Sequence, residues 1–151
     1  MSIIFRTAIE ADEPVIRNIV RRARLHPFNL HWRNFVIALD GDTIVGVGQI
    51  KEHGDGTREL ASMVILPSYQ NQGIGSEIIR QLISGEAGTL YLMCPDFRES
   101  FYIRFDFQTI TISEIPGSLR VWVQLGRWIT SFMALIGSEE FTILAMKREP
   151  Q

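Results

Sequence analysis

Residues Pro67 to Ser76 read PSYQNQGIGS. It follows an apolar run, LASMVIL (60–66), and leads into an amphipathic run, SEIIRQLI (76–83). The two runs predict a strand and then a helix. Glycines at such a turn let the backbone pass close to a ligand, and the free N–H groups of the first helical turn point toward it. The stretch therefore predicts an anion site at the start of a helix.

Length and charge limit what could occupy that site. The chain has 151 residues, which predicts a single domain, residues 1–151, with a core of its own. Fifteen Lys and Arg against seventeen Asp and Glu give a net charge of −2, so we expect no nucleic-acid partner. An anionic ligand must be held locally, and a helix dipole supplies partial positive charge without basic side chains.

Cysteine usage and the N-terminal sequence predict a cytoplasmic protein. Cys94 is the single cysteine, which excludes an internal disulfide and argues against a zinc cluster, so we expect no metal. The N-terminal stretch MSIIFRTAIEADEP carries acids where a signal peptide needs bases and a long apolar run. We find no run that is uninterrupted enough to predict a transmembrane segment.

The remaining pattern predicts an α+β protein with a mostly antiparallel sheet of about seven strands and helices on both faces. Turns at DGD (40–42) and HGDG (53–56) join three consecutive strands as hairpins. The expected strands are 3–8, 35–39, 43–51, 58–66, 89–94, 107–112 and 141–147. The expected helices start at Asp12, near Gly75 and near Arg98, with a fourth over 118–136.

The segment 118–136 is apolar enough to resemble a membrane span. Arg120, Gln124 and Arg127 recur at helical spacing with Ser131 and Ala134, and the opposite stripe is apolar. That apolar stripe consists of Trp122, Leu125, Ile129, Phe132 and Ile136. We therefore expect an amphipathic helix packed on the sheet, with a homodimer surface or a membrane-interface contact as alternatives.

Two familiar phosphate-binding motifs do not fit the turn. A Walker loop needs Lys followed by Ser or Thr after its second glycine, whereas Gly75 is followed by Ser76 and Glu77. A dinucleotide fingerprint needs a small residue where Ile78 stands and a parallel βαβ unit, whereas hairpins precede this turn.

The turn does contain another pattern, Gln70-x-x-Gly73-x-Gly75. It resembles the Q/R-x-x-G-x-G/A signature of the GNAT superfamily of acyl-CoA-dependent N-acyltransferases. FYIRFDF (101–107) resembles a second motif of that family, FYxxxGF, with Asp106 in place of glycine. Because Asp tolerates left-handed and turn conformations, we expect the corner to be kept. The order of elements is also similar to the GNAT fold, and the helix over 118–136 is an addition to it.

The resemblance implies that the turn holds the pyrophosphate of acetyl-CoA, as a co-substrate. Its backbone N–H groups would do so, while the pantetheine arm pairs with the backbone of Met63, Val64 and Ile65. One of these N–H groups would polarise the thioester carbonyl. The implied turn residues are Gln70, Asn71, Gln72, Gly73, Ile74, Gly75 and Ser76.

The resemblance also implies an acid and a base. Tyr102 matches a tyrosine that protonates the departing thiolate, which a phenol can do because it is protonated at neutral pH. Packing of the ring is the alternative. Glu59 stands where several relatives carry the base, and its alternative is an ordinary solvated charge. His53 and the loop residues His26 and His31 are lower-ranked bases.

The loop LHPFNLHW (25–32) corresponds to the region that shapes the acceptor pocket in relatives. Phe28, Asn29, His31 and Trp32 are therefore the predicted acceptor-binding residues. Cys94 raises the possibility of a covalent acyl intermediate, although a buried structural thiol is the favoured interpretation.

The resulting hypothesis is an N-acetyltransferase that moves an acetyl group to a primary amine by direct attack in a ternary complex. The alternative is a non-catalytic acyl-CoA-binding regulatory module. The sequence does not choose among acceptors: small-molecule amines such as amino acids, polyamines and aminoglycosides remain open, as do peptide amines at protein N-termini or lysines.

Overall fold

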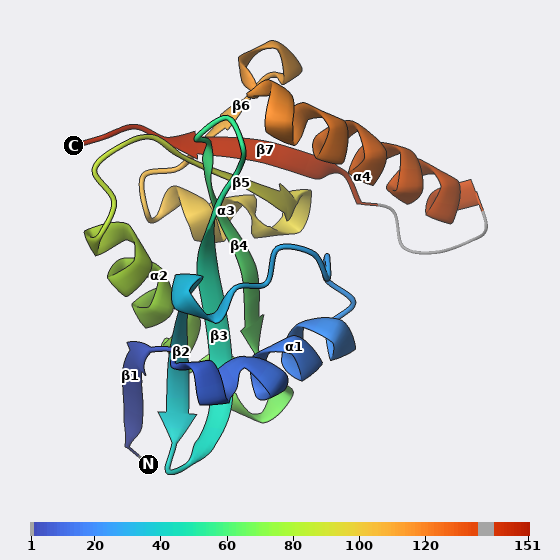
Figure 1. Ribbon diagram of the computed structural model, residues 1–151. Coiled ribbons are helices and arrows are strands. Elements are labelled where there is room, and N and C mark those ends of the chain that lie inside the picture. Colours follow the sequence, from blue (N-terminus) through green and yellow to red (C-terminus); the bar gives the residue numbers. More distant parts are fainter. Residues whose placement is uncertain (1, 136–140) are drawn as a thin grey trace. The chain divides into compact units, whose positions relative to one another are not determined.

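The computed structural model describes residues 2–135 and 141–151, except for the side chains of 128–135 (Figure 1). Contacts within the chain divide it into two compact units. Unit 1 comprises residues 1–51 and 60–86, and unit 2 comprises residues 52–59 and 87–151. The expectation of one domain over 1–151 stays a prediction.

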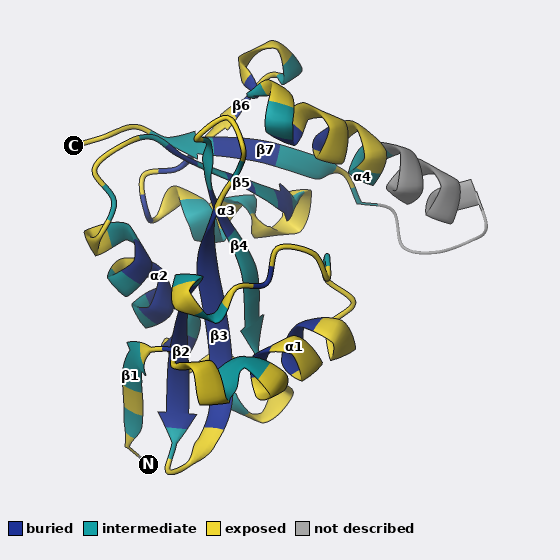
Figure 2. Ribbon diagram, in the orientation of Figure 1, coloured by how far each residue is buried: buried dark blue, intermediate teal, exposed yellow. Residues whose placement is uncertain are grey.

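Unit 1 is built on four strands in the order β1-β2-β3-β4. They are β1 (Ile3–Thr7), β2 (Phe35–Asp40), β3 (Thr43–Glu52) and β4 (Arg58–Ile65). β1 pairs with β2 and β2 pairs with β3, both antiparallel, and the second of these pairings is the hairpin predicted at the turn 40–42. β2 and β3 are buried along almost their whole length, as Figure 2 shows, and only the ends of β3 are exposed.

Two α-helices and three 3₁₀ turns complete unit 1. They are η1 (Glu10–Asp12), α1 (Glu13–Arg22), η2 (Trp32–Asn34), η3 (Pro67–Tyr69) and α2 (Ile74–Ser84). α1 buries Ile16, Ile19 and Val20 in one cluster with Phe35 and Ile37 of β2. The opposite face of α1 carries the exposed arginines, as in an amphipathic helix at the protein surface.

Glycines of β3 let α2 lie close to the strands. A Cβ added at Gly46 would lie 2.8 Å from Ile65 Cδ1 and 3.2 Å from Ile74 Cγ2. A Cβ added at Gly48 would collide with the Met63 side chain and come within 2.9 Å of Ile78. The absence of side chains at these two positions therefore sets the distance from β3 to α2, and with it the position of the turn 67–73.

Unit 2 contains three strands in the order β5-β7-β6. β7 (Ile143–Arg148) pairs antiparallel with both β5 (Leu90–Pro95) and β6 (Gln108–Ile110). The helical elements are η4 (Asp96–Arg98), α3 (Glu99–Ile103), η5 (Ile112–Glu114) and α4 (Gly117–Leu135). Ile110, Ile115, Leu119, Val123 and Ala145 form its buried cluster. The α+β class and the seven mostly antiparallel strands confirm the predicted fold class.

The predicted helix over 118–136 is confirmed as α4, and residue 136 lies outside the described residues. Its predicted apolar stripe was wrong where it can be assessed. Leu119 and Val123 are buried, whereas Trp122 and Leu125 are 37% and 42% exposed. Gly126 of α4 lies against β7, because a Cβ added there would lie 3.3 Å from Ile143 Cγ1. The next residue, Arg127, donates from Nε to the Ile143 carbonyl at 3.1 Å.

The other predicted stripe members, Ile129, Ser131, Phe132 and Ala134, lie outside the described side chains, as does Ile136. Over the described residues, no helix combines the length and the apolar character needed to cross a membrane.

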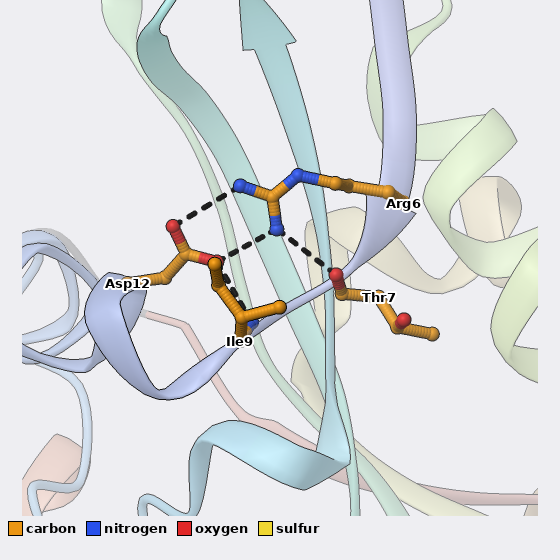
Figure 3. Close-up of polar contacts among 4 residues, drawn as sticks. All are labelled: Arg6, Thr7, Ile9 and Asp12. Atoms are coloured by element: carbon orange, nitrogen blue, oxygen red, sulfur yellow. Dashed lines mark hydrogen bonds and ion pairs between the residues drawn. The ribbon is translucent and has the colours of Figure 1, made fainter.

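An ion pair fixes the junction between β1 and α1 (Figure 3). Arg6 Nη1 and Nη2 donate to the two carboxylate oxygens of Asp12 at 2.7 and 3.2 Å. The same carboxylate accepts the N–H of Ile9 at 2.8 Å. The bonds from Arg6 hold the pKa of Asp12 below its ordinary value, although burial acts in the opposite direction. Asp12 thus stabilises the fold in its ionised form.

Asp12→Asn should lower the free energy of unfolding at pH 7 by about 1 to 2 kcal/mol, because a charged, bidentate partner of Arg6 is lost. Urea denaturation measures this. Since the pKa of Asp12 is lowered by folding, its contribution is complete above about pH 4 and disappears as the pH falls through the lowered value. The wild type and the variant should therefore converge in acid.

Glu13→Gln is the matched control, because Glu13 pairs with Arg17 at 2.7 Å on the surface, with 31% and 46% of the side chains exposed. Its effect should stay below about 0.5 kcal/mol. Equal losses in the two variants would contradict a special role for Asp12.

Candidate functional site

The turn between β4 and α2 has the geometry of an anion site. Asn71 and Gly73 both adopt left-handed backbone conformations, with φ of 62° and 81°. α2 starts at Ile74, and its first backbone bond runs from the Glu77 N–H to the Gly73 carbonyl at 3.1 Å. The N–H groups of Ile74, Gly75 and Ser76 therefore precede the first helical hydrogen bond, and no side chain caps the helix.

The two glutamine side chains of the turn hydrogen-bond to nearby backbone carbonyls. Gln70 Nε2 donates to the Ile65 carbonyl at 3.0 Å, and Gln72 Nε2 donates to the Ser68 carbonyl at 3.3 Å. Both amide side chains thus close the turn onto its own backbone. The groups that the turn leaves for a ligand are its main-chain N–H groups, and their predicted role in holding a pyrophosphate stays a prediction.

A contact that sequence reasoning missed anchors this turn to the β2–β3 hairpin. The Tyr69 hydroxyl donates to Asp40 Oδ2 at 2.7 Å, and this bond raises the pKa of Tyr69. The two residues lie 29 positions apart, so only pairing of the strands brings them together. Tyr69 precedes Gln70 directly, so this bond fixes the start of the turn that forms the candidate anion site.

The strand that leads into the turn is less buried than its neighbour. Met63, Val64 and Ile65, the predicted pantetheine contacts, are half-buried, whereas the facing part of β3 is fully buried. Val64 packs against the cluster that contains α1, and Met63 reaches toward Gly48 and α2. These contacts account for their side chains, and the predicted backbone role stays a prediction.

In unit 2, the predicted base candidates Glu59 and His53 lie together. His53 Nε2 and Glu59 Oε1 are 2.9 Å apart, and the side chains are 15% and 7% exposed. The alternative that Glu59 is an ordinary solvated charge was therefore wrong. A buried carboxylate next to an imidazole is a pair that can accept and share a proton.

Tyr102 stands on α3, with its ring packed edge-on against Phe101 and Phe107 at 5.1 and 6.2 Å between centroids. Burial, with a smaller effect from Cys94, raises the pKa of Tyr102 to about 12. The phenol is therefore protonated at neutral pH and able to donate. The packing explanation for this ring and a role as proton donor are both compatible with its position.

Cys94 is a buried thiol whose Sγ lies 3.8 Å from Met146 Sδ. Burial, followed by the charges of Glu99 and Asp96, raises the pKa of Cys94 to about 11. A thiol of this kind is a poor nucleophile at neutral pH, which favours a structural role.

The corner after α3 is kept. Asp106, where the family motif has glycine, adopts a left-handed conformation with φ of 67°. This agrees with the expectation that Asp tolerates such a corner.

The predicted acceptor residues occupy one loop of unit 1. Phe28 is 67% exposed, and Asn29 has a left-handed φ of 57°. His31 accepts the Arg33 N–H on Nδ1 at 3.3 Å, and the Arg33 guanidinium lies 4.6 Å from the Trp32 ring centroid. Trp32 also packs on the α1 cluster. Phe28 and Asn29 are thus presented to solvent, while His31 and Trp32 have local structural partners as well.

His26, the remaining loop histidine, lies with its ring 5.0 Å from that of Phe28. Across the part of the chain that the structure describes, no cluster of His, Cys, Asp and Glu is arranged to hold a metal ion.

Comparison with known proteins identifies the family. The family model described as acetyltransferase (GNAT) domain matches residues 31–109, which include β4, the turn and Tyr102. A search of curated proteins gave no match.

Among solved structures, N-acetylglutamate synthase from Neisseria gonorrhoeae, complexed with coenzyme A and N-acetyl-glutamate, is similar with a TM-score of 0.72 and 18% identity. The match covers 100% of this chain but 36% of the synthase chain, so this protein spans about a third of that relative.

Two similar structures are close in length to this chain. A Mycobacterium tuberculosis protein in complex with CoA and NLQ has a TM-score of 0.70 and 16% identity over 98% of this chain and 99% of its own. The ribosomal-protein-S18-alanine N-acetyltransferase from Escherichia coli has a TM-score of 0.69 and 16% identity over 99% and 95%. These likenesses show a common fold.

Gly73→Ala should destabilise the protein by about 1 kcal/mol, because alanine disfavours a left-handed φ while its Cβ would meet no atom within 4 Å. Gly88→Ala is the control: the space at Gly88 is equally open, and its φ is not left-handed. Chemical denaturation of both variants measures the difference. Equal stability of the two would contradict the strained turn.

Proposed function

Because the chain belongs to the GNAT acetyltransferase family, we propose that it transfers an acetyl group from acetyl-CoA to a primary amine. The observation that carries the proposal is the turn 70–76, with its two left-handed residues and the free N–H groups at the start of α2. A pyrophosphate is the ligand that such a turn suits best, because it carries several acceptor oxygens and negative charge. Gln70 adds no charge there, so coenzyme affinity should be modest.

The remaining coenzyme contacts come from β4. The backbone groups of Met63, Val64 and Ile65 pair with the amides of the pantetheine arm, as another strand would. One N–H of this stretch donates to the thioester oxygen and stabilises the negative charge that develops on it during attack.

The chemistry is direct attack within a ternary complex. The amine nitrogen attacks the thioester carbonyl carbon, a C–N bond forms, and the C–S bond breaks. Tyr102 donates its phenolic proton to the departing thiolate, and because burial raises the pKa of Tyr102 to about 12 the phenol holds that proton at neutral pH. The pKa of Cys94, also raised, argues against an acyl-cysteine intermediate.

The amine must lose a proton to react, and Glu59 is the proposed base. Its contact with His53 at 2.9 Å allows the proton to be shared between carboxylate and imidazole. His53, which the sequence predicted as a lower-ranked alternative base, is here proposed to assist Glu59. Burial of both side chains favours such a shared proton over simple solvation.

The acceptor is the open element of the proposal. The relatives named above include an N-acetylglutamate synthase and an alanine N-acetyltransferase of a ribosomal protein, so a free amino acid and a protein N-terminus are both reasonable acceptors here. Phe28, Asn29, His31 and Trp32 are the proposed acceptor contacts. We expect the reaction to take place in the cytoplasm.

The direct test is acetyl-CoA-dependent release of free thiol across a panel of amino acids, polyamines, aminoglycosides and short peptides. Thiol release that rises with one class of amine is the expected result. Calorimetry with acetyl-CoA and coenzyme A accompanies the screen. Binding without turnover would leave the non-catalytic module, and no binding at millimolar coenzyme would refute the proposal altogether.

Separate variants test the acid and the base. Tyr102→Phe should reduce kcat by about tenfold or more and Glu59→Gln by about a hundredfold, because each removes one proton transfer. Neither should change the affinity for coenzyme A, which depends on the turn. Steady-state kinetics and calorimetry measure both quantities.

Tyr91→Phe serves as the control for the hydroxyl, since Tyr91 is a half-buried tyrosine that packs against the cluster around Ile110. It should retain wild-type turnover. If Tyr102→Phe behaves in the same way, Tyr102 is not the acid, and if Glu59→Gln does so, Glu59 is not the base.

A further inference from the structure

β4 carries one residue more than its pairing with β3 requires. At the turn, the His53 N–H donates to the Thr57 carbonyl at 2.8 Å. Regular antiparallel pairing from that point would place Ile65 opposite Val45. Instead, the N–H of Leu66 donates to the Val45 carbonyl at 2.9 Å. β4 therefore contains a β-bulge, a feature that turns peptide groups out of the regular ladder.

Ser62 marks the place of this irregularity. Its φ of 57° is left-handed, which is uncommon for serine and costs of order 1 kcal/mol in a strand. Beyond it the shifted register holds, since Met63 lies against Gly48 and Ile65 against Gly46. The bulge therefore comes directly before the stretch 63–65 that is proposed to meet the thioester.

Gln49 of β3 lies opposite Ser62 and holds it. Its Nε2 donates to Ser62 Oγ at 2.8 Å. On its other side Gln49 pairs with Phe35 of β2, and the neighbouring positions of this face, Ile37 and Val47, are apolar and buried. Gln49 itself is completely buried.

A glutamine in this place is not explained by stability. No donor among the described residues reaches its Oε1, and an unsatisfied buried carbonyl costs about 1 to 3 kcal/mol. Leucine has a similar volume and would satisfy the apolar surroundings at no such cost. What Gln49 provides that leucine could not is the hydrogen bond to Ser62, the residue with the left-handed φ.

We propose that Gln49 is a positioning residue for the transfer reaction, acting through Ser62. By holding the bulge, its amide fixes the direction of the β4 peptide groups that follow, including the N–H that donates to the thioester oxygen. Gln49 contacts neither coenzyme nor acceptor in this role, which rests on the proposed acetyl transfer. The strain at Ser62 and the unsatisfied carbonyl of Gln49 are then costs of preorganising a donor.

Gln49→Leu should lower kcat by about tenfold or more, because a misdirected donor loses most of its effect on the developing charge. The calorimetric affinity for coenzyme A should not change, since the turn 70–76 is intact. The midpoint of thermal unfolding should stay equal or rise. If Gln49 were merely structural, its replacement would not lower kcat while leaving the unfolding midpoint equal or higher.

Substitutions at Ser62 supply the matched controls. Ser62→Ala removes the hydroxyl and should reproduce the effect of Gln49→Leu. Glycine adopts a left-handed φ without the hydrogen bond, so adding Ser62→Gly to Gln49→Leu should restore turnover. A loss of kcat that persists in this double variant, or wild-type kcat in Gln49→Leu, would overturn the proposal.

A crystal structure of Gln49→Leu gives an answer independent of activity. The proposal expects residue 62 to leave the left-handed region, and an unchanged φ would contradict it. Failure of the proposed function is recognised separately, because wild-type protein would then neither bind acetyl-CoA nor release thiol.

Discussion

The backbone N–H groups at the start of α2 have no capping side chain, and several other features of the molecule hold them in position. A helix that begins without a capping side chain leaves Ile74, Gly75 and Ser76 with donors directed outward. The surrounding structure serves to hold that helix start in place. Gly46 and Gly48 let α2 approach β3, the left-handed Gly73 closes the turn, and Tyr69 ties it to Asp40 of the neighbouring hairpin.

The β3–β4 hairpin contributes two polar side-chain pairs in addition to its strands, and one member of each pair, Glu59 or Gln49, is buried. Glu59 with His53 stands near the turn, and Gln49 with Ser62 lies further along. Neither pair is the most stable choice for its position, because apolar residues avoid the cost of burying polar groups. Under the proposed acetyl transfer, their presence in one hairpin is stability given up for chemistry: Glu59 with His53 would accept a proton, and Gln49 with Ser62 would direct a backbone donor.

Patterns of local spacing predicted most of the fold. The hairpins, the helix that starts at the glycine turn and the left-handed Asp106 corner follow from residues that are adjacent in sequence, and the structure has them. The side-chain pairs did not follow, since Tyr69–Asp40 and Gln49–Ser62 depend on strand register and on a bulge that no periodicity reveals. The prediction of the buried face of α4 was wrong because the helix carries apolar residues on more than one side. The side that packs is the one with the small residue Gly126, which lies against Ile143.

An NMR titration that follows the backbone amides of residues 71–76 tests whether the turn holds a pyrophosphate. Coenzyme A should shift these N–H resonances strongly, whereas pantetheine, which has no pyrophosphate, should leave them nearly unchanged while affecting residues 63–65. Large shifts of 71–76 with coenzyme A alone would support the account of the turn as a pyrophosphate site. Coenzyme A binding with no response from these amides would contradict it.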